Sequence, residues 1–362
     1  MVNNIENDYG LHQLLHDVLE QEASDLHIMA NAKPAFRLNG DIREMSEYPV
    51  YTKEMTKGMA EYIIKEILQG DIERFYEYDC SFSYKSYGRF RLNIYKTMGS
   101  FALAFRALPR RVKTFDELNL PDQIKKFAGR TNGLVLVTGP TGSGKSTTLA
   151  SLIELINQER NAHIITIEDP IEYIYENERS LVTQREVNGD TKDFASALRS
   201  ALRQDPDVIL VGEMRDPETI QIAMSAAETG HLVLSTLHTV GAIKTIDRII
   251  DSFEAGKQNQ ICSQLSGVLA GVVSQVLMPR ADGNGRVMAC EIMFNTPAIR
   301  NLIRERKPHQ ITSIMQATNN ADMLLLDNEL IRLCRQRVIT PDEAISRAQD
   351  QEKVKAAVNI RR

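Results

Sequence analysis

The sequence predicts an α/β fold in which a smaller α+β domain precedes a larger domain built on a parallel or mixed sheet. From about residue 122, short apolar strands alternate with helices, as in a sheet covered by helices on both faces. Residues 10–108 instead mix two amphipathic helices with strands. The length of 362 residues fits two domains at ~150 residues each. We expect an N-terminal domain over 1–108, a linker over 109–121 and a C-terminal domain over 122–362.

The N-terminal domain is expected to contain a helix, a hairpin, a second helix and three strands, in that order. Apolar residues at three-four spacing predict the helix over 11–21. Asn39-Gly40 can adopt the positive φ angles of a two-residue turn, which predicts a hairpin over 36–45. A second amphipathic helix is expected over 52–69. Strands then follow over 80–84, 89–95 and 101–108.

The C-terminal domain is expected to alternate strands and helices. Strands are expected over 133–139, 163–169, 208–213 and 231–238, and helices over 145–158, 194–204, 217–230 and 242–253. Prolines bound the mixed-charge stretch 109–121, which suits a linker. Beyond residue 254 the pattern predicts mostly helix. The apolar run "VLAGVVSQVLM" at 268–278 is too short to span a bilayer and is interrupted by Ser274 and Gln275.

Composition narrows the class of protein. The net charge of −5 argues against a nonspecific nucleic-acid binder. Four cysteines occur without any CxxC pair, which argues against a zinc knuckle or a disulfide framework. The polar N-terminus "MVNNIENDYG" lacks the apolar region of a signal peptide. We expect a cytoplasmic protein with no nucleic-acid partner and no direct membrane insertion.

A phosphate-binding loop is the strongest motif of the chain. "GPTGSGKST" at 139–147 fits G-x-x-x-x-G-K-[ST], with an apolar strand before it and a helix after it. The glycines let successive backbone N–H groups face a phosphate, and the helix adds its positive dipole end. Lys145 would reach the β and γ phosphates of ATP, and Ser146 would ligate Mg²⁺. The predicted nucleotide-binding residues are Gly139, Pro140, Thr141, Gly142, Ser143, Gly144, Lys145, Ser146 and Thr147.

Two glutamates end strands of the same predicted sheet. Glu168 ends "ITIE" and Glu213 follows "VILVG", where Gly212 cannot bind a metal. Ligands of open α/β sheets lie beyond the carboxyl ends of the strands, so both acids should point toward the phosphates. Hydrolysis needs one group for the attacking water and another in the Mg²⁺ shell. We assign Glu168 to the water and Glu213 to the metal; the reverse assignment stays open.

Two histidines bracket the strand "HLVLSTLH". His238, at its carboxyl end, lies where a γ-phosphate sensor belongs, whereas His231 is expected to have a packing or hydrogen-bonding role. Arg215 could brace Glu213 or reach across a subunit boundary.

Together these motifs resemble one family. The phosphate loop, "TIEDPIEY", "ILVGEMRD" and "AAETGHLVLSTLHT" follow one another as in the ATPases of type II secretion and type IV pili. "PAIRNLIRE" at 297–305 is similar to the signature of the type IV pilus retraction, or twitching-motility, ATPases of the PilT family. The resemblance extends from "SDLHI" near residue 24 to about residue 345. The paired CxxC ligands typical of pilus assembly ATPases are missing from this sequence.

The resemblance implies a RecA-like P-loop ATPase domain preceded by a PAS-like domain, assembled as a homo-hexamer. It implies ATP hydrolysis with Mg²⁺, coupled to pilus retraction at the inner face of the cell membrane. The expected partners there are an inner-membrane pilus platform protein and a paralogous retraction ATPase. N-terminal arginines of this family reach the nucleotide, and Arg89, Arg91 and Arg106 match that region. We expect Arg91 and Arg106 to neutralise charge developing on the γ phosphate.

Two points remain open at the level of sequence. Residues 297–305 fit a plain amphipathic surface helix, or a surface where Arg300 and Arg304 couple hydrolysis to retraction. The chain could also be an accessory ATPase of the same superfamily, or a nucleotide-gated structural subunit with little hydrolysis. The full set Lys145, Ser146, Glu168 and Glu213 argues against the last of these.

Overall fold

The computed structural model describes residues 9–38, 40–67, 76–84, 88–109, 111–317 and 322–359. The chain divides into two compact units. The first comprises Met1–Arg111 with Glu172–Ile174, and the second comprises Val112–Ile171 with Tyr175–Arg362. Segment 112–121, in the stretch expected to be a linker, therefore belongs to the second unit.

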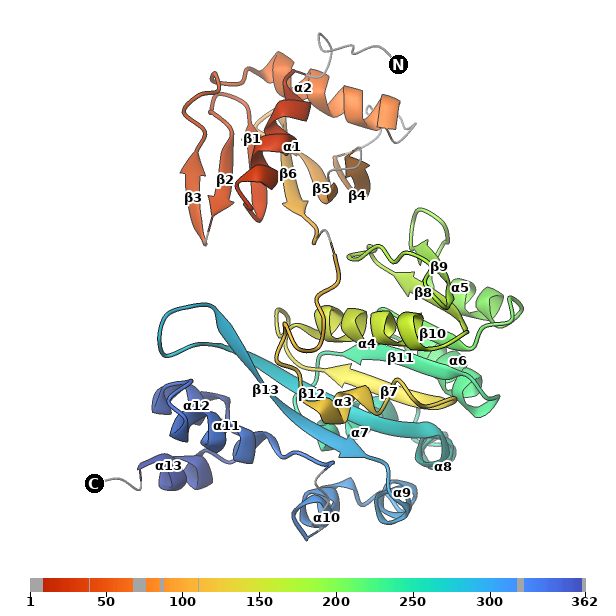
Figure 1. Cartoon of the computed structure of the whole chain (residues 1–362). Coiled ribbons are helices and arrows are strands. Elements are labelled where there is room, and N and C mark those ends of the chain that lie inside the picture. Colours follow the sequence, from red (N-terminus) through yellow and green to blue (C-terminus); the bar gives the residue numbers. More distant parts are fainter. Residues whose placement is uncertain are drawn as a thin grey trace. The chain divides into compact units, whose positions relative to one another are not determined.

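The first unit is an antiparallel sheet with helices (Figure 1). Its strand order is β3 (Asp41–Glu44), β2 (Ala35–Leu38), β1 (Asp25–Met29), β6 (Ser100–Ala107), β5 (Gly88–Thr97) and β4 (Glu77–Tyr84). Its helices are α1 (Leu11–Glu20) and α2 (Lys53–Tyr62), the second continuing as a π-helical turn, Ile63–Ile67. The expected hairpin is present as β2 and β3; Gly40 has a φ of 95°, and Asn39 lies outside the described residues.

Alternation of side chains along the strands decides which face of this sheet is buried. In β5, Phe90, Leu92 and Ile94 are buried, and they join the core with the apolar face of α1. Residues between them, such as Arg91, lie on the opposite face because successive strand side chains point in opposite directions. One face of the sheet is therefore apolar, and the other carries arginines.

The second unit is a mixed sheet of seven strands (Figure 1). The order is β13 (Arg286–Phe294), β12 (Leu269–Pro279), β7 (Gly133–Thr138), β11 (Leu232–Leu237), β10 (Val208–Val211), β8 (His163–Glu168) and β9 (Leu181–Glu186). All neighbours are parallel except β12 and β13. The central strands are buried along their whole length, which explains their continuous apolar runs.

Helices cover this sheet and follow the strand–helix rhythm of the sequence. They are α3 (Asp122–Lys125), α4 (Lys145–Glu159), α5 (Phe194–Ala201), α6 (Pro217–Glu228), α7 (Ala242–Asp251) and α8 (Gln258–Val268). Helices α5 to α8 share one core with Leu134 and Leu136 of β7. Side-chain caps fix where α5 and α6 begin. Asp193 accepts from the Ser196 N–H at the start of α5, and Asp216 accepts from the Thr219 N–H at the start of α6.

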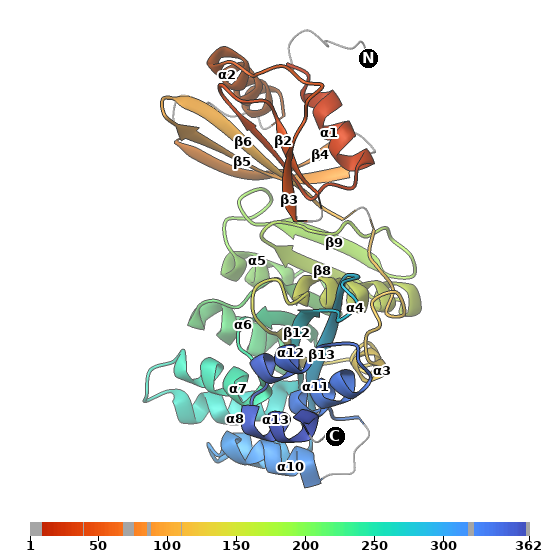
Figure 2. The ribbon, with the colours of Figure 1, turned by 90° about the vertical axis from the view of Figure 1, so that its left-hand side faces the viewer.

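Helices are the more numerous elements beyond residue 254, as expected, but the expectation missed β12 and β13, which form a long antiparallel pair there. The run 268–278 ends α8 with Val268 and continues as the almost completely buried strand β12. Periodicity cannot separate such a strand from a buried helix, although its β-branched residues favour a strand. The helices that do follow are α9 (Pro297–Arg304), α10 (Ile311–Ala317), α11 (Leu326–Arg335), α12 (Pro341–Arg347) and α13 (Gln351–Asn359), with a 3₁₀ turn at Pro308–Gln310. Figure 2 shows α11, α12 and α13 gathered as one cluster.

Candidate nucleotide site

The phosphate loop lies between β7 and α4, as expected. Gly139, Gly142 and Gly144 have φ angles of 143°, 78° and 88°, which residues with a Cβ rarely adopt. A Cβ on Gly139 would lie 2.1 Å from the backbone oxygen of Gln275. The loop therefore depends on glycine for both its curvature and its fit against β12.

The cationic and hydroxyl groups of the loop lie at the start of α4. Lys145 Nζ donates to the carbonyl oxygens of Gly139 at 3.0 Å and Pro140 at 3.2 Å, so the ammonium stays over the loop. Ser146 is exposed in the first helical turn. An exposed hydroxyl and an ammonium beside a helix N-terminus fit a polyphosphate with its metal.

Gln275 on β12 supports the phosphate loop, a role that the sequence did not reveal. Its side chain is buried on β12, and Nε2 donates to the Ser143 carbonyl oxygen at 2.6 Å. Burial of an amide is unfavourable without such a bond. The polar pair Ser274-Gln275 inside an apolar run was the available signal.

Glu168 ends β8, and neighbouring side chains fix its carboxylate. Thr166 Oγ1 donates to Oε1 at 2.6 Å, and Gln184 Nε2 approaches the same oxygen at 3.4 Å. Gln184 lies on β9, which pairs with β8 in parallel. The two donors hold the acid at the strand end.

Glu213 lies beyond β10 and is held by an arginine and a histidine. Its Oε1 is 3.0 Å from His238 Nε2, and its Oε2 is 2.9 Å from the guanidinium of Arg215. The Glu213 side chain is 18% exposed, against 49% for His238. The structure thus brings Glu213 and His238 together, and Arg215 braces Glu213 within the same chain.

Gly212 directly follows β10, at the position where an acid could stand, and Glu213 comes next. Its N–H donates to the Ile167 carbonyl oxygen at 2.8 Å, and its own carbonyl accepts from Thr236 Oγ1 at 2.6 Å. A Cβ there would lie 3.3 Å from the Ile167 oxygen. The glycine links β10 to both neighbouring strands, and Glu213 is the first side chain past the sheet.

Strand order places the predicted groups along one edge of the sheet. Strands β7, β11, β10 and β8 are parallel neighbours, so their carboxyl ends lie side by side. These ends lead into the phosphate loop, His238, Glu213 and Glu168 respectively. An open α/β sheet binds its ligands at this edge.

His231, at the opposite end of β11, has local partners. Its Nδ1 lies 2.9 Å from the Ala226 carbonyl oxygen and 3.2 Å from Thr229 Oγ1. These contacts close the turn after α6 and agree with a structural role.

The N-terminal arginines belong to the first unit, where they lie on the open face of its sheet. The register aligns Arg37, Asp25, Arg106 and Arg91 across β2, β1, β6 and β5. Arg106 Nε donates to Asp25 Oδ1 at 2.9 Å, and Arg37 Nε lies 3.9 Å from Asp25 Oδ2. Arg91 is exposed next in this row, and Arg89 donates to Ser81 on β4.

The donors at the sheet edge fit Mg²⁺ better than a transition metal. Mg²⁺ prefers oxygen ligands and is usually bound through one or two carboxylates, substrate phosphates and water. Ser146 and Glu213 offer such oxygens. Among the described residues, no cluster of three or more His, Cys, Asp or Glu side chains forms an all-protein metal site.

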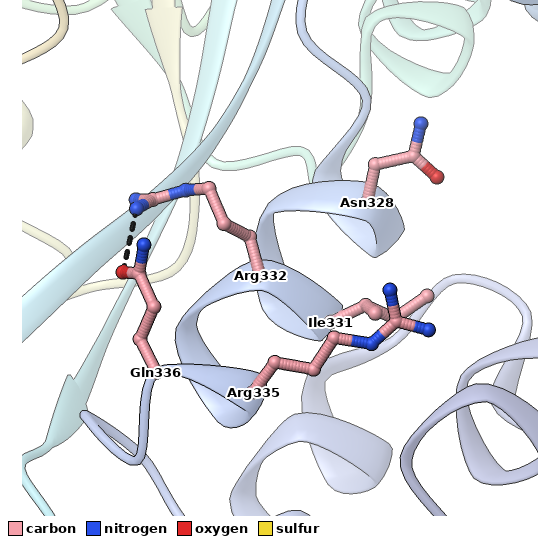
Figure 3. Close-up of a pocket in the computed structure, with 5 residues that line it drawn as sticks. All are labelled: Asn328, Ile331, Arg332, Arg335 and Gln336. Atoms are coloured by element: carbon pink, nitrogen blue, oxygen red, sulfur yellow. Dashed lines mark hydrogen bonds between the residues drawn. The ribbon is translucent and has the colours of Figure 1, made fainter. Parts of the chain in front are cut away.

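A hollow of about 440 Å³ lies on α11, and none of the predicted nucleotide-site residues line it. Asn328, Ile331, Arg332, Arg335 and Gln336 line it (Figure 3). Arg332 is bonded to Glu329 and Gln336 on its own helix.

In the ranges that the structure describes, no helix has the length and apolar character needed to cross a membrane.

Nearly the whole chain is similar to known proteins. The family model of the type II/IV secretion system proteins matches residues 4–346. A twitching motility protein of Neisseria gonorrhoeae is 46% identical over 344 residues, covering 95% of this chain and 92% of that protein. The type IV pilus retraction ATPase PilT of Pseudomonas aeruginosa is 46% identical over 336 residues, covering 93% and 97%. The crystal structure of the pilus retraction motor PilT with bound ADP matches with a TM-score of 0.88 at 45% identity, covering 95% of this chain and 98% of that chain.

Proposed function

Because the chain belongs to the type II/IV secretion system protein family, we propose that it works as a homo-hexameric motor retracting type IV pili. It is an ATPase, and its relatives at 46% identity are a twitching motility protein and a retraction ATPase. One observation carries the proposal: the phosphate loop and both acids lie at the carboxyl ends of neighbouring parallel strands.

The groups of this edge divide the work of hydrolysis. Lys145 and the loop N–H groups hold the phosphates and offset their charge. Glu168, fixed by Thr166, orients the attacking water and accepts its proton. His238 contacts the γ phosphate and, through its bond to Glu213, reports its presence to β10.

The Ser146 hydroxyl would hold Mg²⁺ directly, and Glu213 would hold it through water. When bound, the ion would neutralise charge on the β and γ phosphates. Arg215 and His238 keep Glu213 oriented for this role.

Arg91 is better placed than Arg106 to serve as the arginine finger. Arg106 is engaged by Asp25, whereas Arg91 is exposed on the same face. Moving a guanidinium to a nucleotide costs less free energy if the move does not leave a partly buried carboxylate without its partner. In this assignment Arg106 and Arg37 support the face that presents Arg91.

The ring acts in the cytoplasm, peripheral to the inner face of the cell membrane. It is held there by an inner-membrane pilus platform protein, and a paralogous retraction ATPase assists it. Nucleic acid is not a partner, in keeping with the acidic net charge.

The test is steady-state phosphate release by the wild type and by Lys145→Ala. The wild type should hydrolyse ATP with a kcat in the usual range of enzymes, roughly 1–10³ per second. Lys145→Ala should weaken ATP binding by about tenfold or more, because it removes the ammonium that offsets phosphate charge. A wild type that binds ATP but releases no phosphate would identify a nucleotide-gated structural subunit instead.

A further inference from the structure

A buried carboxylate lies outside the groups that hydrolysis uses. Glu291, on β13, is only 5% exposed. Its Oε1 accepts from the Ala242 N–H at 2.7 Å, and its Oε2 accepts from Gln349 Nε2 at 3.0 Å. One side chain thus connects the first turn of α7 to the segment between α12 and α13.

The bond to Ala242 fixes the end of a short loop that begins at the predicted phosphate sensor. His238 follows Leu237, the last buried residue of β11, and residues 239–241 lead directly into α7. The Gly241 N–H donates to the buried Ser274 Oγ at 2.7 Å. Gly241 has a φ of 96°, and a Cβ there would lie 2.8 Å from Gln349 Nε2. The loop therefore fits closely between β12, β13 and Gln349.

The C-terminal helices support the same loop from a second direction. Val240 packs against the apolar cluster formed by α11 to α13 with β12 and β13. Asp327, at the start of α11, accepts from the main-chain N–H groups of Gln349 at 2.8 Å and Asp350 at 3.1 Å. Gln349 is therefore fixed at its backbone by α11 and at its side chain by Glu291.

A carboxylate is an unfavourable choice for this position unless its bonds matter. Burial raises the pKa of Glu291, and the N–H of Ala242 and the Gln349 amide offset part of that rise. A well-packed apolar side chain would avoid the desolvation penalty. The carboxylate offers two oxygens to two separate segments, which no apolar side chain can do.

We propose that Glu291 is a positioning residue that holds the loop after His238 and links it to the C-terminal helices. By fixing Ala242, next to the Gly241 that Ser274 holds, it sets the distance from His238 to Glu213. Through Gln349 it makes that distance depend on the packing of α11 to α13. The inference rests on the proposed role of His238 in ATP hydrolysis.

The test compares Glu291→Gln with Glu352→Gln, a matched change at an exposed site on α13. Glutamine keeps the shape but replaces one accepting oxygen with an NH2 group, so the Gln349 amide must reverse to keep its bond, and the negative charge behind both bonds is lost. We expect kcat to fall about tenfold, since a 1 Å misplacement of a catalytic group can cost about a hundredfold. ADP affinity should stay within about twofold, because the loop 139–147 is untouched. Glu352→Gln should match the wild type in both.

A double-mutant cycle separates positioning from general destabilisation. If Glu291 acts through His238, adding Glu291→Gln to His238→Ala should change kcat by less than about twofold. Multiplying losses in the double variant would overturn the proposal, as would a wild-type kcat in Glu291→Gln. Where Glu291→Gln does not fold, Gln349→Ala at its exposed position should show the same partial loss of kcat and the same non-additivity with His238→Ala. Absence of ATPase activity in the wild type would refute the proposed function itself, which distinguishes that outcome from a failure of the role proposed for Glu291.

Discussion

At the scale of single residues, Glu168 and Glu213 differ in their surroundings. Neutral donors hold Glu168, namely Thr166 and Gln184. Arg215 and His238 hold Glu213, one on each carboxylate oxygen. Because both of its oxygens already have partners, Glu213 suits a ligand that reaches Mg²⁺ through water, and Glu168 remains the group for the attacking water.

We therefore predict different defects for the two glutamine variants. Glu168→Gln should bind Mg·ATP normally and lose about a hundredfold or more in kcat, because it removes proton acceptance from the attacking water. Glu213→Gln should instead raise the Mg²⁺ concentration needed for half-maximal activity. Single-turnover hydrolysis with Mg²⁺ titration measures both. Wild-type turnover by Glu168→Gln would assign the water to another residue, and exchanged phenotypes would support the reverse assignment.

Asp25 provides a residue-scale test in the first unit. Burial would raise the pKa of Asp25, but hydrogen bonds from Ser24 and Arg106 hold it below its ordinary value of 3.8. A lowered pKa in the folded state gives stability that is present above the ordinary pKa and lost as pH falls through the lowered one.

Asp25→Asn should therefore lower the free energy of unfolding by about 1 kcal/mol at pH 7, since Arg106 is largely exposed. The difference from the wild type should shrink as pH falls from 5 toward 3. Urea unfolding at several pH values measures it. The exposed Asp79→Asn is the matched control. A difference that stays constant with pH would show that the carboxylate charge is not what stabilises this row.

Among the site residues, those that the sequence could predict belong to contiguous motifs. The loop 139–147 and the strand ends at Glu168, Glu213 and His238 each follow from a local pattern. Gln275, Asp25 and Glu291 could not be assigned, because their partners lie far away in the chain: Gln275 bonds Ser143, and Asp25 bonds Arg106. A single sequence does not reveal which distant strands become neighbours.

At the scale of elements, α9 shows a division between a packed face and an exposed face. Thr296 caps the helix, and Ile299 and Ile303 are buried against the main core. Arg300 and Arg304 are exposed, and Arg304 is bonded only locally, to Asn301. Since neither arginine contributes to the core, they are available to a partner or a neighbouring subunit.

Arg300→Ala combined with Arg304→Ala should abolish twitching while ATP turnover stays within about twofold of the wild type, because exposed substitutions rarely disturb a core. Twitching zones and phosphate release, measured on the same variants, check this. Lys353→Ala with Lys355→Ala removes two exposed charges from α13 and should leave both unchanged. Equal loss of ATPase and motility would reduce α9 to a structural helix.

Two strands that the sequence missed gave little signal, for different reasons. Strand β12 is buried on both faces, so its apolar run has no period of two. Strand β9 lies at the sheet edge with intermediate exposure and a polar sequence, which gives little apolar signal. Apart from β9, the strands and helices from 133 to 253 were predictable because buried parallel strands and amphipathic helices alternate there at short intervals.

At the scale of the whole molecule, the groups for hydrolysis belong to the second unit and the candidate arginine finger to the first. A motor needs its catalytic groups on more than one unit, because hydrolysis does mechanical work only if it changes the orientation of one unit relative to another. In the proposed motor, the acids and the loop carry out hydrolysis, and the ring with its membrane partner would convert it into force on a filament.

Deletion of the gene in its host should therefore remove retraction without removing assembly. We expect long or numerous surface pili and loss of twitching, because filaments would still be polymerised but no longer withdrawn. Electron microscopy of pili and a twitching assay measure the two effects. Wild-type protein supplied in trans should restore both, and Lys145→Ala should restore neither, since it keeps the fold and loses phosphate binding. Cells without pili would place the motor in assembly, and unchanged cells would assign its work to another filament.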